Sequence, residues 1–319
     1  MNCKQRVVAA IRREAVDGIP SCFSYHFRPG LGSGEPAAQA HLEFFERTDT
    51  DILKIMNENL VPNMGQIRTA DDWKCIRTPS LKDDFMLRQI ELVERILERC
   101  DHTRFTMGTL HGAVASSIHP IEAVYGYEGT RRLMCEHLRE NRQPVMDAFR
   151  RIADGMTLLA RKYVELGLDS VFYAALGGEK HYFTDEEFEA LVKPLDLQIL
   201  DAIRDAGGYA FLHICKENLE LSRYADYAPH ADVVNWGVYE APCPLEKGRE
   251  LFPGKTIMGG LQNRAGILVE GPIEELKAAT RRVIEDFGRT GFIIGADCTL
   301  PTGLDNARIR VVVETARSM

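Results

Sequence analysis

Three residues with the chemistry of metal ligands stand at the ends of two strand-like segments. The first segment, residues 209–214, contains His213 and is followed directly by Cys215. Because side chains alternate along a strand, His213 and Cys215 face the same side. The second segment, residues 292–296, ends just before Cys298. One imidazole and two thiolates with an open fourth position are the ligands of a catalytic zinc site, and thiolates favour zinc over magnesium or calcium.

These cysteines also admit a purely structural interpretation. The chain has eight cysteines, and free cysteine is among the residue types most often buried in protein cores. The 82 residues between Cys215 and Cys298 form no recognisable spacing, and the local Cys-x-x-Cys pattern of structural zinc sites is missing. The residues alone therefore leave two alternatives open: a zinc site, or cysteines buried as small hydrophobic residues.

The elements that must position these residues alternate between strand-like and helix-like segments. Short apolar runs bounded by turn residues are typical of buried parallel strands. Eight such runs occur, at residues 21–26, 51–56, 104–110, 170–174, 209–214, 232–236, 256–260 and 292–296. Helical periodicity separates many of them, at residues 84–100, 143–166, 184–204 and 272–287. Residues 112–152 lack a clear strand and indicate an insertion of helices.

This pattern predicts an α/β fold: a (β/α)8 TIM barrel with N-terminal and mid-chain helical additions, in a single domain over residues 1–319. An open doubly wound sheet is the alternative. In a barrel, functional groups lie at the carboxyl ends of the strands and in the loops that follow. Five further residues occupy such positions and are weaker candidates for substrate binding or catalysis: His26, Glu58, His111, Glu179 and Asn235. Glu179 is also a candidate for the fourth zinc ligand.

The overall composition narrows the classes of partner. The chain has 319 residues, with 39 basic and 47 acidic side chains and a net charge of −8 at pH 7. This balance argues against a nucleic-acid binder, which must neutralise phosphates, and against docking on an anionic membrane. The first residues form an amphipathic stretch without an apolar signal core, and no apolar run is long enough to cross a bilayer. We therefore expect a reduced, cytoplasmic protein whose partners are neither nucleic acid nor membrane.

Several motifs along nearly the whole chain resemble the uroporphyrinogen decarboxylase superfamily. The resemblance is carried by RVVAAIRR at residues 6–13, DGIP at 17–20, GGEK at 177–180, YFTDEEF at 182–188, MGGL at 258–261 and GADCTLP at 295–301. Resemblance to this superfamily implies a (β/α)8 barrel, in agreement with the strand count.

The decarboxylases of this superfamily form one of its two main branches. They use no metal and hold a tetrapyrrole with an Arg-Gln-Ala-Gly-Arg segment after the first strand. Here residues 24–30 read SYHFRPG, so only Arg28 resembles part of that segment. Asp51 stands where a decarboxylase-like aspartate is expected. A metal-free tetrapyrrole decarboxylase is therefore one alternative function.

The second branch is the cobalamin-dependent methyltransferases, which carry His-x-Cys and a distant Cys as zinc ligands. His213, Cys215 and Cys298 match this pattern. The resemblance implies a zinc-containing enzyme that moves a methyl group between a small methylated substrate or thiol and the cobalt of a corrinoid (cobalamin). The corrinoid motif Asp-x-His-x-x-Gly is missing, so a partner corrinoid protein is expected. A non-catalytic binding barrel is a further alternative, and homodimers are common among such barrels.

Overall fold

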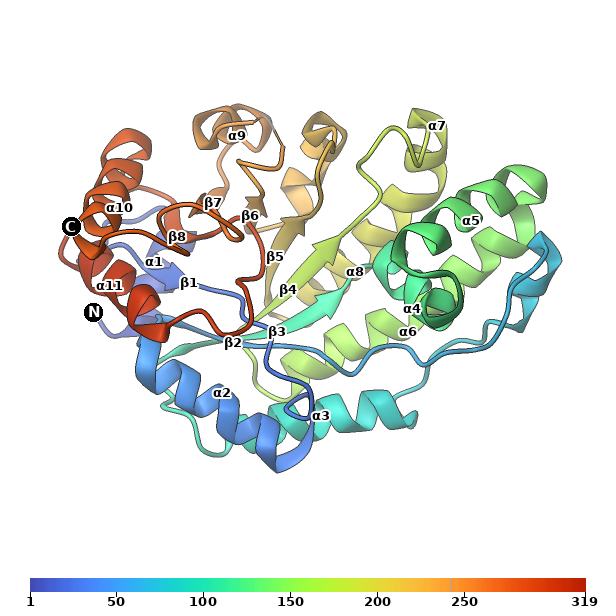
Figure 1. Cartoon of the computed structure of the whole chain (residues 1–319), viewed down its shortest axis with the longest axis horizontal. Helices are drawn as coiled ribbons and strands as arrows, with labels where there is room; N and C mark the ends of the chain where they lie inside the picture. Colours follow the sequence, from blue (N-terminus) through green and yellow to red (C-terminus); the bar gives the residue numbers. More distant parts are fainter. Residues whose placement is uncertain (242) are drawn as a thin grey trace.

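Eight parallel strands form one sheet that curls into a nearly closed barrel (Figure 1). The structure is a computed structural model that describes residues 1–241 and 243–319. Parallel ladders join neighbours from β2 through to β8, and β1 pairs with β8. The strands are β1 (Ser21–Cys22), β2 (Ile52–Ile55), β3 (Phe105–His111), β4 (Ser170–Ala175), β5 (Tyr209–Ile214), β6 (Val233–Trp236), β7 (Thr256–Leu261) and β8 (Phe292–Ala296). The fold is the (β/α)8 TIM barrel that the strand pattern predicts.

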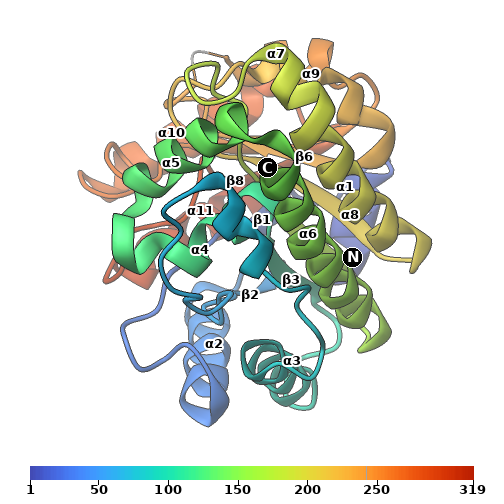
Figure 2. The same ribbon diagram turned by 90° about the vertical axis from the view of Figure 1, so that its right-hand side faces the viewer.

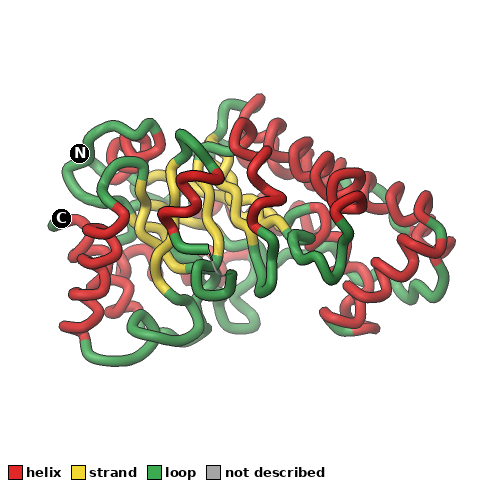
Figure 3. Tube along the Cα trace, turned by 90° about the horizontal axis from the view of Figure 1, so that it is seen from above, coloured by secondary structure: helices red, strands yellow, loops and turns green. Residues whose placement is uncertain are grey.

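Helices surround the strands, as the view in Figure 3 shows. The α-helices are α1 (Cys3–Ile11), α2 (Gly34–Thr48), α3 (Asp84–Leu97), α4 (Ala113–Tyr125), α5 (Tyr127–Glu140), α6 (Arg142–Glu165), α7 (Asp185–Glu187), α8 (Lys193–Asp205), α9 (Leu245–Leu251), α10 (Ile273–Phe287) and α11 (Asn306–Arg317). Two 3₁₀ helices, η1 (Ala70–Cys75) and η3 (Leu221–His230), and one π-helical turn, η2 (Phe188–Val192), complete them. Within the part of the chain that the structure describes, no helix combines the length and apolar character needed to cross a membrane.

The helical insertion expected over residues 112–152 is present. α4, α5 and the first part of α6 fill this stretch without a strand. Figure 1 shows the three helices together on one side of the barrel, on the right of that view, and Figure 2 faces this side. Both chain termini lie on the other side, near α1 and α11 (Figure 1).

The barrel interior is filled from the end where its strands begin. Apolar side chains from all eight strands, among them Phe105 and Phe211, pack with Val7 and Ala10 of α1. α1 therefore covers the bottom of the barrel, which is the N-terminal helical addition expected from the sequence. The opposite end, where the strands finish, is left for the functional site.

Side chains close the seam between β1 and β2, because these two strands share no backbone ladder. The Asp51 carboxylate accepts hydrogen bonds from the backbone N–H and the hydroxyl of Ser21, at 3.0 and 2.9 Å. Arg6 donates to the same carboxylate at 2.5 Å. Asp51 is fully buried at the start of β2, at the bottom of the barrel. This position does not fit the catalytic aspartate that the decarboxylase alternative requires.

The expected strand bounds agree with the structure to within one residue, except at the first strand. Residues 21–26 were expected to form that strand, but its ladder with β8 covers only Ser21 and Cys22. Tyr25 adds an isolated parallel bridge to Leu300. The strand is short because it is paired on one side alone, so the chain beyond Cys22 is free to turn toward the barrel mouth.

Gly248 in α9 allows the helix to lie directly against the ring of Trp236. A Cβ at this position would lie 1.9 Å from a ring carbon of Trp236, which is fully buried and donates its Nε1–H to the carbonyl of Cys243. We therefore expect Gly248→Ala to lower the free energy of unfolding by about 1–3 kcal/mol, despite the better helix propensity of alanine. Denaturant unfolding measures the change.

Gly129→Ala in α5 is the matched control for this prediction. Its Cβ would meet the Cβ of Tyr125 at an ordinary distance of 3.6 Å. Helix propensity then acts alone, and the variant should be unchanged or slightly more stable. Equal losses of stability in the two variants would show that close packing at Gly248 is not the cause.

Candidate metal centre

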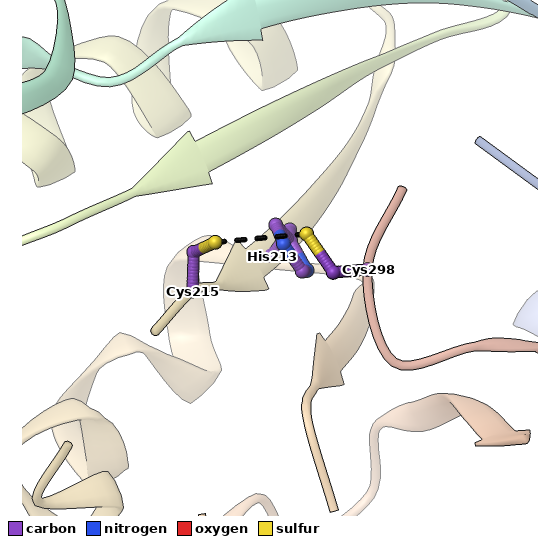
Figure 4. A group of neighbouring side chains, drawn as sticks. All are labelled: His213, Cys215 and Cys298. Atoms are coloured by element: carbon purple, nitrogen blue, oxygen red, sulfur yellow. Dashed lines mark hydrogen bonds between the residues drawn. The ribbon is translucent and has the colours of Figure 1, made fainter. Parts of the chain in front are cut away.

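His213, Cys215 and Cys298 converge at the carboxyl end of the barrel, as the sequence predicts. His213 lies on β5, Cys215 directly after β5, and Cys298 just after β8. Their side-chain donor atoms all lie within 4.8 Å of one another, and the two Sγ atoms are 3.7 Å apart (Figure 4). Two sulfurs bound to one tetrahedral zinc at about 2.3 Å each lie about 3.8 Å apart. The spacing of the thiols therefore fits zinc.

The His213 ring is held in one orientation by Asn235 on the neighbouring strand β6. The Nδ2 of Asn235 donates to the carbonyls of Met258 and Ala296, at 2.9 and 3.3 Å. Since both partners are acceptors, the amide can turn only its oxygen toward His213, and Oδ1 lies 2.6 Å from Nδ1 of the ring. Nδ1 must therefore carry the proton, which leaves the lone pair of Nε2 free.

Nε2 of His213 is the atom that tests whether a metal fits here. It is buried and has no hydrogen-bond partner among the described residues. A buried polar atom without a partner is costly, and a metal ion satisfies an imidazole lone pair directly. A hydrogen bond from the other ring nitrogen to a fixed acceptor is the usual support of a zinc-binding histidine. The donor set, its spacing and this free lone pair all fit zinc.

The thiols of Cys215 and Cys298 lie within hydrogen-bond distance of each other, and either can be the donor. The hydrogen bond with Cys215 lowers the pKa of Cys298 although burial opposes that shift. The same hydrogen bond, together with burial, raises the pKa of Cys215. Cys298 is therefore the sulfur that most readily carries negative charge, which is the form that binds a metal.

A cavity of about 590 Å³ opens beside the three donors. His213, Cys215 and Cys298 form part of its lining, and Phe172 and Leu176 contribute apolar wall. The ring of Phe172 stacks on that of His213 with centroids 5.0 Å apart. The cavity volume is that of a small-molecule site.

His26 and Glu58, two of the weaker candidates, form a pair near this cavity. Nδ1 of His26, which lines the cavity, lies 2.6 Å from Oε1 of Glu58. The hydrogen bond raises the pKa of His26, and it lowers the pKa of Glu58 although burial opposes that shift. The pair is thus favoured in its charged form at the rim of the site.

His111 also lines the cavity and is accompanied by His119, a residue not predicted from the sequence. Their rings meet edge to face, with centroids 5.1 Å apart. Burial lowers the pKa of His111 to about 4 and that of His119 to about 3. Both side chains are therefore neutral at pH 7, and both form part of the cavity wall.

The neutral histidines predict a dependence of stability on pH. Burial also lowers the pKa of His41 to about 4, so His41, His111 and His119 all titrate below their unfolded value of about 6.5. The unfolded chain then binds protons that the folded chain does not, and the free energy of unfolding falls as the pH drops from about 6.5 to about 4. Urea unfolding at several pH values measures this slope.

Two variants test whether these buried histidines cause the dependence of stability on pH. His41→Gln removes one buried imidazole and should flatten the slope. His102→Gln removes an exposed histidine and should leave the slope unchanged. A free energy of unfolding that stays constant between pH 7 and pH 5 would contradict the prediction.

Glu179 and Asn235, two of the weaker candidates, are both engaged by other groups of the protein. Glu179 is buried and bound to Arg131 at 2.5 Å, and it is not part of the group of donors around His213. Its carboxylate neutralises a buried guanidinium, which argues against Glu179 as the fourth zinc ligand. Asn235 was expected to contact substrate, but both ends of its amide are engaged by His213 and backbone carbonyls. Its role is to orient His213.

Lys54 is a site residue that sequence reasoning missed. It lies on β2, is 2% exposed and lines the cavity. A lysine in the centre of the apolar run Ile52–Ile55 is the signal that could have revealed it, because lysine is rarely buried without a partner.

The structure is a (β/α)8 barrel with one imidazole and two thiols gathered at the carboxyl ends of its strands. Residues 37–319 match the family model of uroporphyrinogen decarboxylase (URO-D). The chain therefore belongs to the URO-D family, as the sequence motifs indicate.

Solved structures share this fold along the whole chain. A methyltransferase from Methanosarcina mazei superposes with a TM-score of 0.79 at 15% identity, covering 99% of this chain and 98% of that one. A B12-independent methionine synthase from Shewanella sp. W3-18-1, in complex with selenomethionine, gives a TM-score of 0.60 at 11% identity, covering 94% and 97%. At these identities the likeness establishes the fold alone. Comparison with curated proteins found no match in sequence.

Proposed function

We propose that this protein is a zinc-dependent methyltransferase that moves a methyl group between a small substrate and the corrinoid of a partner protein. The observation that carries the proposal is the convergence of His213, Cys215 and Cys298 beside the cavity. These three donors leave the fourth position of a tetrahedral site for a substrate atom. Two solved proteins with this fold are a methyltransferase and a B12-independent methionine synthase. Both support methyl transfer as an activity of this fold, and the corrinoid is part of our proposal alone.

In this proposal each residue of the site has a distinct role. Cys215 and Cys298 would hold zinc as thiolates, and His213 would bind it through Nε2. When bound, zinc acts as a Lewis acid on the substrate heteroatom, activating a thiol or polarising a methylated oxygen, nitrogen or sulfur. Asn235 keeps the His213 ring in its binding orientation. Phe172 packs on that ring and restricts access of water from one side.

The corrinoid is assigned to a partner because the sequence contains no Asp-x-His-x-x-Gly motif. Methyl transfer to or from cobalt is a displacement, so the cobalt must approach the methyl group in line. The barrel mouth is the end where the cavity lies, and Leu60 on its lining is 37% exposed. We expect the corrinoid protein to dock over this end.

The decarboxylase alternative receives less support from the site. Arg28, the residue that resembles part of the tetrapyrrole-binding segment, is exposed and does not line the cavity beside the donors. Asp51 lies at the other end of the barrel, bound to Arg6.

A screen of methyl donors and acceptors tests the proposed function. Zinc-loaded protein is mixed with free cob(I)alamin and a panel of methyl ethers, methylamines and methyl thioethers, and methylcobalamin is followed by its absorption spectrum. The reverse direction uses methylcobalamin with a panel of thiols. We expect turnover with at least one compound, loss of turnover after chelation and recovery on adding zinc.

Two results would contradict this function. One is turnover of a porphyrinogen by the metal-free protein, which would establish the decarboxylase alternative. The other is the absence of methyl transfer in both directions by protein that carries one zinc per chain, tested also with candidate corrinoid proteins. The second result would favour a binding barrel without catalysis.

A further inference from the structure

Lys54 presents a positive charge to the floor of the cavity. The β2–β3 register pairs Lys54 with Met107, so that Lys54 lies deeper in the barrel than His111 at the end of β3. Its Nζ donates to the hydroxyl of Ser24 and lies 3.2 Å from the centre of the Phe172 ring. The side chain is 2% exposed.

The groups in direct contact with this ammonium, Ser24 and Phe172, carry no negative charge, and the nearest groups that can ionise are the thiols of Cys22, Cys215 and Cys298. An ammonium has three N–H donors, and the Ser24 hydroxyl takes one of them. No carboxylate of the described residues forms an ion pair with Lys54, although a buried charge is costly unless it is paired. Burial lowers the pKa of Lys54 to about 8, so the group remains largely charged at pH 7. The Phe172 ring lies against the ammonium as well, and Lys54 lines a cavity in which an acceptor for the remaining donor can lie.

The surroundings of the cavity reinforce this charge. Lys216, which also lines the cavity, lies over the ring of Tyr127 and forms no ion pair with a described carboxylate. Arg264 is the third cation of the lining and lies 3.8 Å from Glu240. Among the described residues that line the cavity, Glu122 is the single one with a carboxylate side chain. A chain with a net charge of −8 thus places two lysines on the lining of this cavity, neither of them in an ion pair with a described carboxylate.

We propose that the substrate of this site is a small anion, in the simplest case a carboxylate, whose acidic group binds Lys54 while its reactive heteroatom lies at the metal position. This inference rests on the proposed function and specifies its substrate class. Phe172 contacts both Lys54 and the ring of His213, so a molecule a few bonds long reaches from the ammonium to the metal ligands. Charge-assisted hydrogen bonds of this kind are among the strong ones in proteins.

A structural role for Lys54 is the competing explanation. Ser24 and Lys54 face each other across the seam between β1 and β2, where no backbone ladder exists. A lysine that only closes this seam would affect stability but would not distinguish a charged ligand from a neutral one. The test must therefore compare ligands that differ in charge alone.

The experiment is calorimetric titration of zinc-loaded protein with 3-mercaptopropionate and with its neutral amide. Mercaptoacetate and 4-mercaptobutyrate, each with its amide, vary the distance between the thiol and the acidic group. We expect one carboxylate to bind about 10- to 100-fold more tightly than its amide. Lys54→Met should abolish this preference, and Lys54→Arg should keep part of it. Lys74→Met, which removes an exposed lysine of η1, should leave it unchanged.

The outcomes test the charge of the substrate independently of the proposed methyl transfer. Equal binding of acid and amide by the wild-type protein at every length would overturn the inference, and this comparison needs no variant. A full preference in folded, zinc-loaded Lys54→Met would overturn it as well. A clear preference for the acid without methyl transfer would keep Lys54 as an anion-binding residue and reject the methyltransferase assignment instead.

Discussion

Cys298→Ala is expected to lose its zinc and to reduce methyl transfer by more than about 100-fold. Changes in groups that merely support a metal ligand already cost about 10- to 100-fold, so loss of a ligand should cost more. Cys298 is the thiol that ionises more readily, because the hydrogen bond with Cys215 lowers its pKa, and the thiolate is the form that binds zinc. Elemental analysis of the purified variant and the cobalamin assay measure the two effects.

The matched control for this prediction is Cys75→Ala. Cys75 is exposed at the end of η1 and has no part in the donor cluster. The control should retain about one zinc per chain and full turnover. Full zinc content in the double variant Cys215→Ala with Cys298→Ala would refute the ligand assignment, and full turnover without zinc would refute the role of the metal.

The second large effect is expected at Asn235. Asn235→Leu removes the acceptor 2.6 Å from Nδ1 of His213, so the ring can rotate or move its proton to Nε2. We expect zinc affinity to fall about 10- to 100-fold, the usual cost of losing the support of a metal-binding histidine. Competition with a zinc chelator of known affinity measures the change.

Asn235→Asp distinguishes orientation of the ring from general stability. The aspartate keeps an acceptor for Nδ1, but its second oxygen faces the carbonyls of Met258 and Ala296. We expect this variant to be less stable to denaturant and yet to bind zinc nearly as tightly as the wild type. Parallel losses of stability and zinc affinity in both variants would indicate that Asn235 acts only through the fold.

The fold was accessible from the sequence because each strand is recognisable by itself. A parallel strand covered on both faces must be apolar along its length, so runs such as Tyr209–Ile214 and Phe292–Ala296 stand out between helices. The first strand was overestimated because its length depends on its neighbours: it pairs with β8 and has no ladder with β2. The residues of the strand itself do not indicate that β2 fails to pair with it.

The residues of the site differ in how much of their position and role could be predicted from the sequence. His213 and Cys215 are two positions apart on one strand, so the period of the strand places them on one face. Lys54 could have been noticed as a charge inside an apolar strand, but only the packing shows that its partners are Ser24 and Phe172. The buried contact of Glu179 with Arg131, 48 residues away in the chain, could not be predicted from the sequence and is shown by the packing alone.

The sequence by itself determined the donor types and the barrel that presents them, since both follow from residue identity and local periodicity. Tertiary structure alone decided that Cys298 meets Cys215 at 3.7 Å across a separation of 83 positions in the chain. It also decided that Asn235 leaves the lone pair of His213 Nε2 free. The physical reason is that barrel closure sets these distances, and closure depends on the packing of all eight strands together.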